Sequence, residues 1–173
     1  LIGPKHLPRL FRDFDSNELP NYLKNIIDLA GAKLPYNTDQ WDGYPNEREQ
    51  FYRNIEESQS NIILAGDSHD SWLSNLYDSK DKFVGIEIGA PSITSPNSID
   101  TFGSKINMIE DAFIKENKNL KWINGRNKGY VQLTISNENV KVKYHYVSNV
   151  KSKKYAMLKP VTFTLSHNHP VNS

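Results

Sequence analysis

Apolar residues in two segments of the first sixty positions recur with the spacing of amphipathic helices. In segment 19–30 they repeat at intervals of three and four, and Gly31 follows as a C-terminal stop. A second helix is predicted from Asn46 to about Ser58, because Asn46 and Glu49 resemble a capping pair. Its apolar face is thin, so this helix is expected to lie on the outside of the strand that follows it.

Short apolar runs in the centre of the chain predict strands of a buried sheet. Ile62–Ala65 is continuously apolar and rich in β-branched residues, which is typical of a strand buried on both faces. Phe83–Ile88 predicts a second strand, whereas the apolar residues of Asp70–Tyr77 have helical spacing and predict one or two helical turns. A further amphipathic helix begins at Ile106 and is expected to end near 117–119.

The last part of the chain alternates between apolar and polar residues, which is the pattern of strands with one wet face. Gly129–Ile135 and Val140–Val147 are joined by Ser136–Asn139, a turn-forming sequence, and predict an antiparallel hairpin. Val161–Leu165 predicts a last strand. Helices alternating with buried strands, followed by a hairpin, indicate an α/β (α+β) fold with a mixed sheet. The length suits a single domain over residues 1–173.

Composition excludes several classes of protein and leaves others open. With 21 basic and 20 acidic residues the net charge is +1, which gives no electrostatic case for a nucleic-acid partner. The short cluster at 151–154 is interpreted as a solvated turn. The chain has no cysteine, so disulfides, thiolate zinc sites and cysteine nucleophiles are excluded. No apolar run approaches the roughly 20 residues of a transmembrane helix, so no transmembrane segment is expected.

The strongest candidate chemistry follows the first buried strand, in Gly66-Asp67-Ser68-His69. Ligands tend to bind beyond the carboxyl ends of strands in such sheets, so Asp67 and His69 emerge where chemistry is usually done. A carboxylate and a neutral imidazole two residues apart suit one cation, and Gly66 permits close approach. The same four residues are also compatible with an aspartate in a turn and a histidine on the surface, neither of which binds a ligand.

Other motifs are weaker or absent. The chain lacks a Gly-x-Ser-x-Gly elbow and a phosphate-cradling Gly-x-x-x-x-Gly-Lys loop. The hydroxyl-rich loop 89–97 suits either a phosphate site or an ordinary connection. His167 and His169 have the spacing of metal ligands, but a fraying terminus is expected there. Metal-assisted hydrolysis suits the remaining oxygen and imidazole groups, although a two-metal centre needs more ligands than this one compact pair.

Several segments together resemble the carboxyl-terminal half of the PhoD-type alkaline phosphatases. The resemblance covers roughly residues 32–150 and rests on the order and spacing of its motifs. These are Leu34-Pro35-Tyr36-Asn37-Thr38-Asp39-Gln40-Trp41-Asp42-Gly43-Tyr44-Pro45, the Gly66–His69 strand end, Ser71-Trp72, Val84-Gly85-Ile86-Glu87, Pro91–Pro96 and Asn119–Trp122.

The resemblance implies a calcineurin-like metallophosphoesterase. The expected fold is the carboxyl-terminal half of an αββα sandwich, and the expected reaction is hydrolysis of phosphomonoesters or phosphodiesters by metal-activated water. Asp67 and His69 inherit the metal-ligand role, with His69 also catalytic, and the cofactors implied are calcium and iron, with zinc or manganese as alternatives. The residues expected to line the site for the phosphate-ester substrate are Asn37, Asp39, Trp41, Asp42, Tyr44, Ser92 and Thr94.

Two departures limit what the resemblance implies. Asn117-Lys118-Asn119 stands where the family commonly has Asn-Pro-His, which removes a histidine from that loop. The amino-terminal half, which carries the early aspartate-rich metal motifs in the family, is missing, so the isolated chain is expected to be inactive and to need that half as a partner. A periplasmic or secreted location is implied by resemblance alone. A non-catalytic module that binds a partner or carbohydrate through Trp41, Tyr44 and the hydroxyl-rich loop 89–97 is the alternative.

Overall fold

The computed structural model describes residues 24, 28, 32, 39–55 and 61–172. Most of the helix predicted over 19–30 and the predicted site residue Asn37 lie outside the described residues. The described elements are, in chain order, η3 (Trp41–Gly43), α3 (Pro45–Asn54), β1 (Ile62–Ala65), β2 (Ser71–Tyr77), β3 (Phe83–Gly89), α4 (Ser98–Phe102), η4 (Gly103–Lys105), α5 (Ile106–Glu116), β4 (Leu120–Asn124), β5 (Lys128–Ile135), β6 (Asn139–Val147) and β7 (Val161–Ser166). No described helix is long and apolar enough to cross a membrane.

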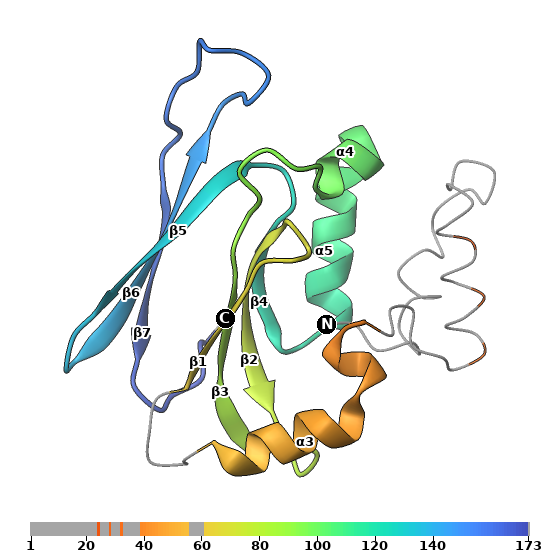
Figure 1. The fold of residues 1–173 in the computed structure, drawn as a ribbon, viewed down its shortest axis with the longest axis vertical. Coiled ribbons are helices and arrows are strands. Elements are labelled where there is room, and N and C mark those ends of the chain that lie inside the picture. Colours follow the sequence, from red (N-terminus) through yellow and green to blue (C-terminus); the bar gives the residue numbers. More distant parts are fainter. Residues whose placement is uncertain (1–23, 25–27, 29–31, 33–38, 56–60, 173) are drawn as a thin grey trace.

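Two β-sheets pack face to face, and α5 covers the outer face of one of them (Figure 1). The first sheet has the strand order β1-β3-β2-β4, and the second has the order β5-β6-β7. Only the β1–β3 pair is parallel in the first sheet, so this sheet is mixed, while the second is antiparallel throughout. The predicted α+β class, with a mixed sheet and a C-terminal antiparallel hairpin, is confirmed, and β7 adds a third strand to that hairpin.

The main core lies between the two sheets. It consists of inward-facing residues of both sheets, namely Leu73, Ile86, Ile88, Val140, Val142, Tyr144, Tyr146 and Leu165. Two buried tyrosines also connect the layers by hydrogen bonds, because the Tyr144 hydroxyl donates to the Trp72 carbonyl at 2.7 Å and the Tyr146 hydroxyl donates to Ser71 Oγ at 2.8 Å. Burial raises the pKa of both phenols far above the ordinary value, so they remain neutral donors.

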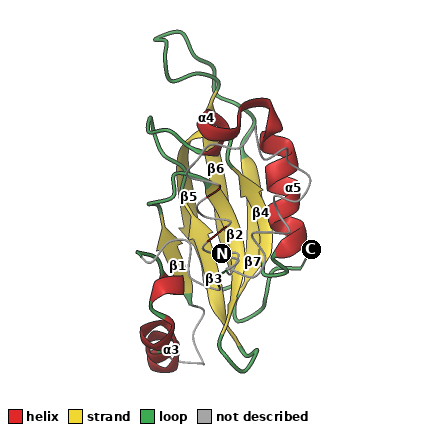
Figure 2. Cartoon of the chain, turned by 90° about the vertical axis from the view of Figure 1, so that its right-hand side faces the viewer, coloured by secondary structure: helices red, strands yellow, loops and turns green. Residues whose placement is uncertain are grey.

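A smaller core lies on the other face of the first sheet, beneath α5. Trp72, Leu120 and Ile123 form it, and Phe113 of α5 packs against them. Figure 2 shows α5 running along this sheet, with α4 at one end of the molecule and α3 at the other. No residue of α3 is buried, which agrees with the thin apolar face expected for this helix.

The segment predicted as a helical turn, Asp70–Tyr77, is a strand instead. As β2 it lies between β3 and β4, and its side chains alternate between the two cores. Trp72 faces the core beneath α5 and Leu73 faces the core between the sheets. A strand with apolar residues on both faces has no alternating pattern, so the apolar residues of this strand fell by chance at helical intervals. Its partner β4 was not predicted at all.

The first strand is less buried than its apolar sequence predicted. β1 is an edge strand that pairs only with β3 among the described residues, and Leu64 is 62% exposed. The prediction of a strand buried on both faces is therefore wrong for this chain, because no described layer covers Leu64.

Two local predictions also fail. The predicted capping pair of Asn46 and Glu49 is wrong, because α3 has Tyr44 as its N-cap residue and Pro45 in its first turn, and no side chain caps it.

The expected fraying of the C-terminal tail is also wrong. The buried Asn75 side chain exchanges two hydrogen bonds with the Val171 backbone, at 2.8 and 3.0 Å, and these hold the tail in place.

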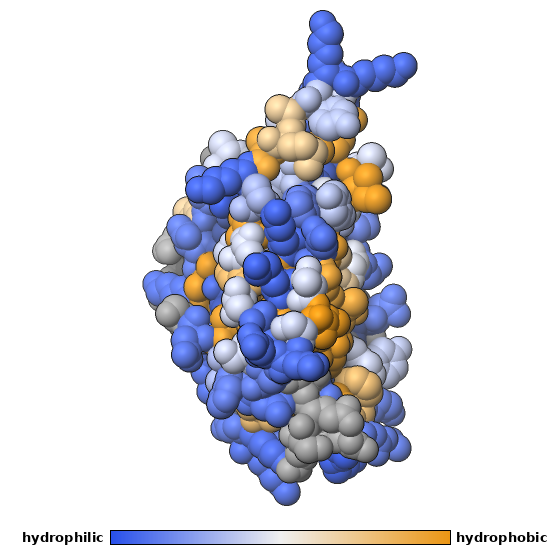
Figure 3. Space-filling model, turned by 90° about the vertical axis from the view of Figure 1, so that its left-hand side faces the viewer, coloured by the Kyte–Doolittle hydropathy of each residue, from blue (hydrophilic) through white to orange (hydrophobic). Residues whose placement is uncertain are grey.

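The outer face of the second sheet is polar, as the hairpin pattern predicted. Figure 3 shows this side of the molecule, where hydrophilic residues cover most of the surface. Lys141 is exposed there, and His145 stacks on Tyr130 with ring centroids 4.7 Å apart. His145 therefore has a partner on the wet face of the sheet.

Candidate functional site

The turn Gly66–His69 leaves the carboxyl end of β1 and leads into β2. The His69 amide donates to the Gly66 carbonyl at 3.2 Å, which closes the turn. His69 adopts a φ of 65°, a left-handed conformation that is uncommon for a residue with a side chain. Such a conformation persists when surrounding contacts hold it; it clusters at functional sites, but in this chain Asp81 and Asn168 also adopt it.

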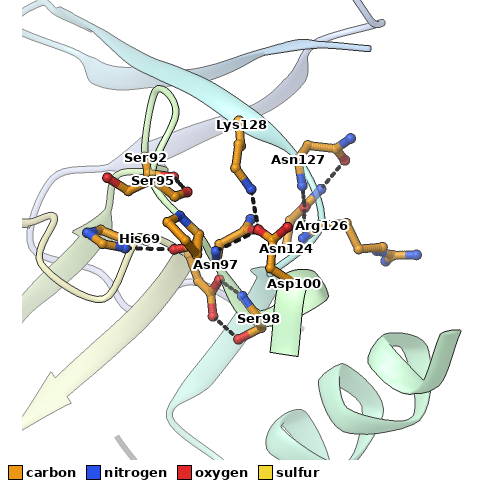
Figure 4. Close-up of polar contacts among 12 residues, drawn as sticks. His69, Ser92, Ser95, Asn97, Ser98, Asp100, Asn124, Arg126, Asn127 and Lys128 are labelled. Atoms are coloured by element: carbon orange, nitrogen blue, oxygen red, sulfur yellow. Dashed lines mark hydrogen bonds and ion pairs between the residues drawn. The ribbon is translucent and has the colours of Figure 1, made fainter. Parts of the chain in front are cut away.

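The contacts that hold His69 come from the loop after β3. The Ser92 amide donates to the His69 carbonyl at 3.0 Å, and His69 Nδ1 lies 2.7 Å from the Pro96 carbonyl (Figure 4). A carbonyl oxygen only accepts, so Nδ1 carries the hydrogen. Neutral His69 then has an unprotonated Nε2, which is the form in which a histidine binds a metal.

The next residue, Asp70, also forms hydrogen bonds with the end of the loop that follows β3. Its buried carboxylate accepts hydrogen bonds from both the amide and the hydroxyl of Ser98. Burial raises the pKa of Asp70, and the Ser98 hydrogen bonds and the charges of His69 and Lys128 partly offset that rise. Asp70 is thus occupied in fixing the loop that orients His69.

The ion pair between Lys128 and Asp100 stabilises the end of the loop that follows β3. Lys128 Nζ donates to Asp100 Oδ2 at 2.6 Å and to Asn97 Oδ1 at 2.7 Å. The backbone amide of Asn97 donates to the same Asp100 oxygen at 3.0 Å. Asn97 and Asp100 form the capping box of α4. The Lys128 hydrogen bond is the main cause of the lowered pKa of Asp100, so this carboxylate is ionised at neutral pH.

A cavity of about 670 Å³ adjoins the strand end and contains several of the predicted site residues. It brings Asp39, Trp41 and Tyr44 together with Asp67. Trp41 and Tyr44 are each half exposed, and Trp41 stacks on Phe51 with ring centroids 5.7 Å apart. With Glu47 and Glu87, which also line it, the cavity combines four carboxylates with aromatic walls.

Two features of this cavity indicate space for a ligand. Ser68 lines it, and its buried hydroxyl has no hydrogen-bond partner among the described residues. A Cβ added to Gly66 would meet nothing within 4 Å, so the side of this glycine is open. A buried polar atom without a partner is uncommon in a folded protein and points to a missing group.

The other predicted residues are not brought into this cavity. His69 is absent from its lining because it turns toward Pro96. Ser92 is buried and donates to the Ser95 carbonyl at 2.7 Å, which is a loop-forming contact. Thr94 is exposed and lines a different cavity. The side chain of Asp42 is not described.

A metal ion fits this arrangement in part. A carboxylate and a neutral imidazole are suitable donors for iron, zinc or manganese, and a histidine ligand normally donates its other ring N–H to a carbonyl or carboxylate, as His69 does to Pro96. Within the described ranges, no group of three or more histidine, aspartate or glutamate side chains is arranged to hold an ion. The described turn therefore contains two donors of suitable type, Asp67 in the cavity lining and His69 outside it.

The supporting residues Pro96, Ser98, Asp100 and Lys128 were not predicted. The Asn97-x-x-Asp100 spacing resembles a capping pair, so α4 and its acid were detectable. The contacts of Lys128 and Ser98 join positions about 30 residues apart, and local sequence patterns carry no information on such contacts.

Comparison with known proteins identifies similar sequences and one similar structure. The family model described as PhoD-like phosphatase matches residues 14–144. Alkaline phosphatase D of Bacillus subtilis (strain 168) is 31% identical over 157 residues, which cover 83% of this chain and 26% of that protein. A solved structure of PhoD superposes with a TM-score of 0.60 at 28% identity, over 78% of this chain and 26% of the other. The chain thus spans about a quarter of the length of either relative.

Proposed function

The chain belongs to the PhoD-like phosphatase family, and we propose that it forms one edge of the active site of a metal-dependent phosphoester hydrolase. In this proposal Asp67 and His69 are metal ligands, and His69 also orders the reacting groups. The substrate is a phosphomonoester or phosphodiester.

The observation that carries this proposal is the orientation of His69. Its Nδ1–H donates to Pro96 and its backbone is held by Ser92, so Nε2 is the ring nitrogen left for a metal ion. A bound cation would polarise the phosphoryl oxygen and lower the pKa of a water toward about 7. The contribution of this chain is to supply the two donors and to fix, through Pro96, which ring nitrogen of His69 carries the hydrogen in the neutral form.

The aromatic cavity is proposed to receive the organic part of the ester. Trp41 and Tyr44 offer apolar surface beside Asp67, while Asp39 supplies a polar contact. Asn37 and Asp42 join this set through the family motif alone. Ser92 and Thr94 are proposed to act on the other side of the turn, where the loop that contains them holds His69.

The remaining ligands are proposed to come from the part of the catalytic domain that this chain does not cover. Two protein ligands are fewer than the four of a typical zinc site or the six to eight of a calcium site. Calcium and iron are the proposed ions, with zinc or manganese as substitutes. A secreted or periplasmic location is proposed with the function.

Hydrolysis of p-nitrophenyl phosphate tests this assignment. The protein assayed must contain both this chain and the rest of the catalytic domain. We expect Asp67→Asn and His69→Ala to lower the rate by about 100-fold or more, because loss of a residue that only supports a metal ligand already costs roughly 10- to 100-fold. Asp111→Asn and His145→Ala change exposed or outer-face residues and serve as matched controls. Unchanged rates in the two site variants would overturn the assignment.

A non-catalytic binding module is the second candidate, and the half-exposed Trp41 and Tyr44 favour it. Such a module would bind a carbohydrate or another partner through the aromatic cavity without a metal. It predicts that ligand binding survives Asp67→Asn and His69→Ala but is lost in Trp41→Ala, whereas the hydrolase predicts loss of activity in all three.

A further inference from the structure

The loop between β6 and β7 projects beyond the rest of the described fold. This projecting loop comprises residues 148–160 and stands out at one end of the molecule (Figure 1, Figure 2). The hydroxyl-rich loop 89–97 lies beside its base, because Thr94 and Pro96 line one cavity together with Asn149. The two loops therefore form a common surface at this end of the molecule.

The projecting loop is basic and contains no acidic residue. It has four lysines, whereas the totals for the whole chain are nearly balanced, with 21 basic and 20 acidic residues. The charge of Lys151 acts on Asp100 and helps to lower the pKa of that carboxyl, so this lysine has a partner within the fold. The side chains of Lys153, Lys154 and Lys159 form no hydrogen bond or ion pair with a described residue. Their positive charge is therefore left for an external partner.

Exposed apolar side chains accompany these lysines. Tyr155 is 61% exposed and Met157 is 55% exposed, and Ile93 of the neighbouring loop is 72% exposed. Met157 forms an antiparallel bridge with Val147, and side chains two positions apart in extended backbone point to the same side, as expected for Tyr155 and Met157. Single exposed apolar residues are ordinary, but three on two adjoining loops indicate a surface that is covered in use.

Hydrogen bonds hold the projecting loop in a defined shape. At its base the Ser148 amide donates to the Ala156 carbonyl and the Leu158 amide donates to the Tyr146 carbonyl, each at 2.9 Å. Three further backbone amides of the loop donate to side-chain oxygens within it. A loop fixed in this way presents its lysines and apolar side chains together, with little ordering left to lose on binding.

From this arrangement we infer that the projecting loop docks the protein on an anionic membrane surface. Each lysine close to such a surface is attracted by the charged headgroups, while tyrosine and methionine bury apolar surface at the boundary between headgroups and acyl chains. A soluble polyanion would match the lysines but would give no role to Met157 and Ile93. The combination of charge and exposed apolar side chains therefore favours a lipid surface.

Docking at this end places the membrane next to the candidate site. The hydroxyl-rich loop that adjoins the projecting loop also holds His69, through the Pro96 carbonyl and the Ser92 amide. No residue of the turn Gly66–His69 takes part in the docking itself. The inference therefore goes beyond the proposed hydrolase and does not depend on it.

Co-sedimentation with lipid vesicles tests the docking. The protein assayed should contain both this chain and the rest of the catalytic domain, so that a loop covered by that part gives no binding. We expect binding to vesicles that contain phosphatidylglycerol, and at least about 10-fold weaker binding to vesicles of phosphatidylcholine alone. The double variant Lys153→Gln with Lys154→Gln should weaken binding to the anionic vesicles about 10- to 30-fold, as expected for two lysines near the surface.

A matched control removes the same charge from the opposite end of the molecule. Lys80 lies in the turn between β2 and β3, and Lys118 lies between α5 and β4. Lys80→Gln with Lys118→Gln should leave vesicle binding within about twofold, because charges farther from the surface than a Debye length are screened. Equal weakening by the two lysine pairs, or no binding of the parent to anionic vesicles, would overturn the docking.

A second pair of substitutions tests the apolar contribution. Tyr155→Ser with Met157→Ser should weaken vesicle binding by about 10-fold, because apolar contact with the interface is lost. Vesicle binding equal to that of the parent would show that charge acts alone, as for a soluble polyanion, and would overturn a membrane as the partner. Unchanged urea midpoints would show that these exposed substitutions leave the fold intact. Asp67→Asn should leave vesicle binding unchanged, so failure of the hydrolase and failure of the docking are distinguishable.

Discussion

Gly89 at the end of β3 provides a sharp test of how the first sheet is packed. A Cβ added to Gly89 would lie 2.1 Å from Cδ2 of Trp72 and 2.4 Å from two further ring atoms. Trp72 is 4% exposed, packs with Leu120 and Ile123, and donates from Nε1 to Glu87 Oε1 at 2.8 Å. The ring is thus held on several sides, so Gly89→Ala forces either the ring or the strand to move.

The size of the effect follows from that overlap. Carbon atoms pack best at about 3.5–4.0 Å, so the ring must move by roughly 1.4 Å or more to admit the methyl group. Overpacking in a tight core costs about 1–3 kcal/mol, and loss of the Trp72 side chain from the core sets an upper limit of about 3–5 kcal/mol. We expect Gly89→Ala to lower the free energy of unfolding by about 2–4 kcal/mol.

Urea denaturation followed by tryptophan fluorescence measures this change. Gly66→Ala is the matched control, since the added methyl group meets nothing within 4 Å and Gly66 does not have a positive φ. The control should stay within about 0.5 kcal/mol of the parent, or gain slightly from the reduced freedom of the unfolded chain. Equal midpoints for Gly89→Ala and Gly66→Ala would refute the described packing of β3 against Trp72.

Three further predictions concern the contacts around the cores. Tyr146→Phe removes the hydrogen bond from its hydroxyl to the fully buried Ser71 hydroxyl and should lower the free energy of unfolding by about 1 kcal/mol; Tyr130→Phe on the exposed face should change it little. Burial raises the pKa of Glu110, so the folded chain binds this proton more tightly than the unfolded chain. The free energy of unfolding should therefore fall as pH rises from the ordinary pKa of Glu110 through the raised one, and Glu110→Gln should show a shallower pH dependence. Asn75→Ala should free the C-terminal tail, which would be seen as faster amide hydrogen exchange at 169–172. An unchanged exchange rate would show that the two hydrogen bonds between Asn75 and Val171 do not hold the tail.

The β5–β6 hairpin and α5 were predicted correctly from the sequence. Apolar and polar residues alternate along most of the hairpin, and α5 begins at Ile106 and ends close to where its apolar spacing does. β2 was misjudged because it is buried on both faces, which removes the alternation that identifies a strand. β1 was misjudged in the opposite sense, since its apolar sequence predicts cover that the described residues do not supply.

The candidate site was predictable only in its first part. Gly66–His69 is distinctive because a strand ends there in a carboxylate and an imidazole. The loop that orients His69 depends on three contacts that span 27 or 28 residues, namely His69 with Pro96, Asp70 with Ser98, and Asp100 with Lys128. The first two form because the parallel pairing of β1 and β3 brings the Gly66–His69 turn beside the loop after β3. The roles of Asp67 and His69 as ligands stay predictions.

Paramagnetic NMR with Mn²⁺ tests the central claim most directly, because it detects even weak binding to a partial site. The account predicts that low Mn²⁺ concentrations broaden the amide signals of Gly66–Asp70 first, and that Asp67→Asn and His69→Gln each abolish this broadening. Asp111→Asn and His145→Gln should leave it intact. Broadening that is centred elsewhere, or that persists in both site variants, would contradict the assignment of Asp67 and His69 as one edge of a metal centre.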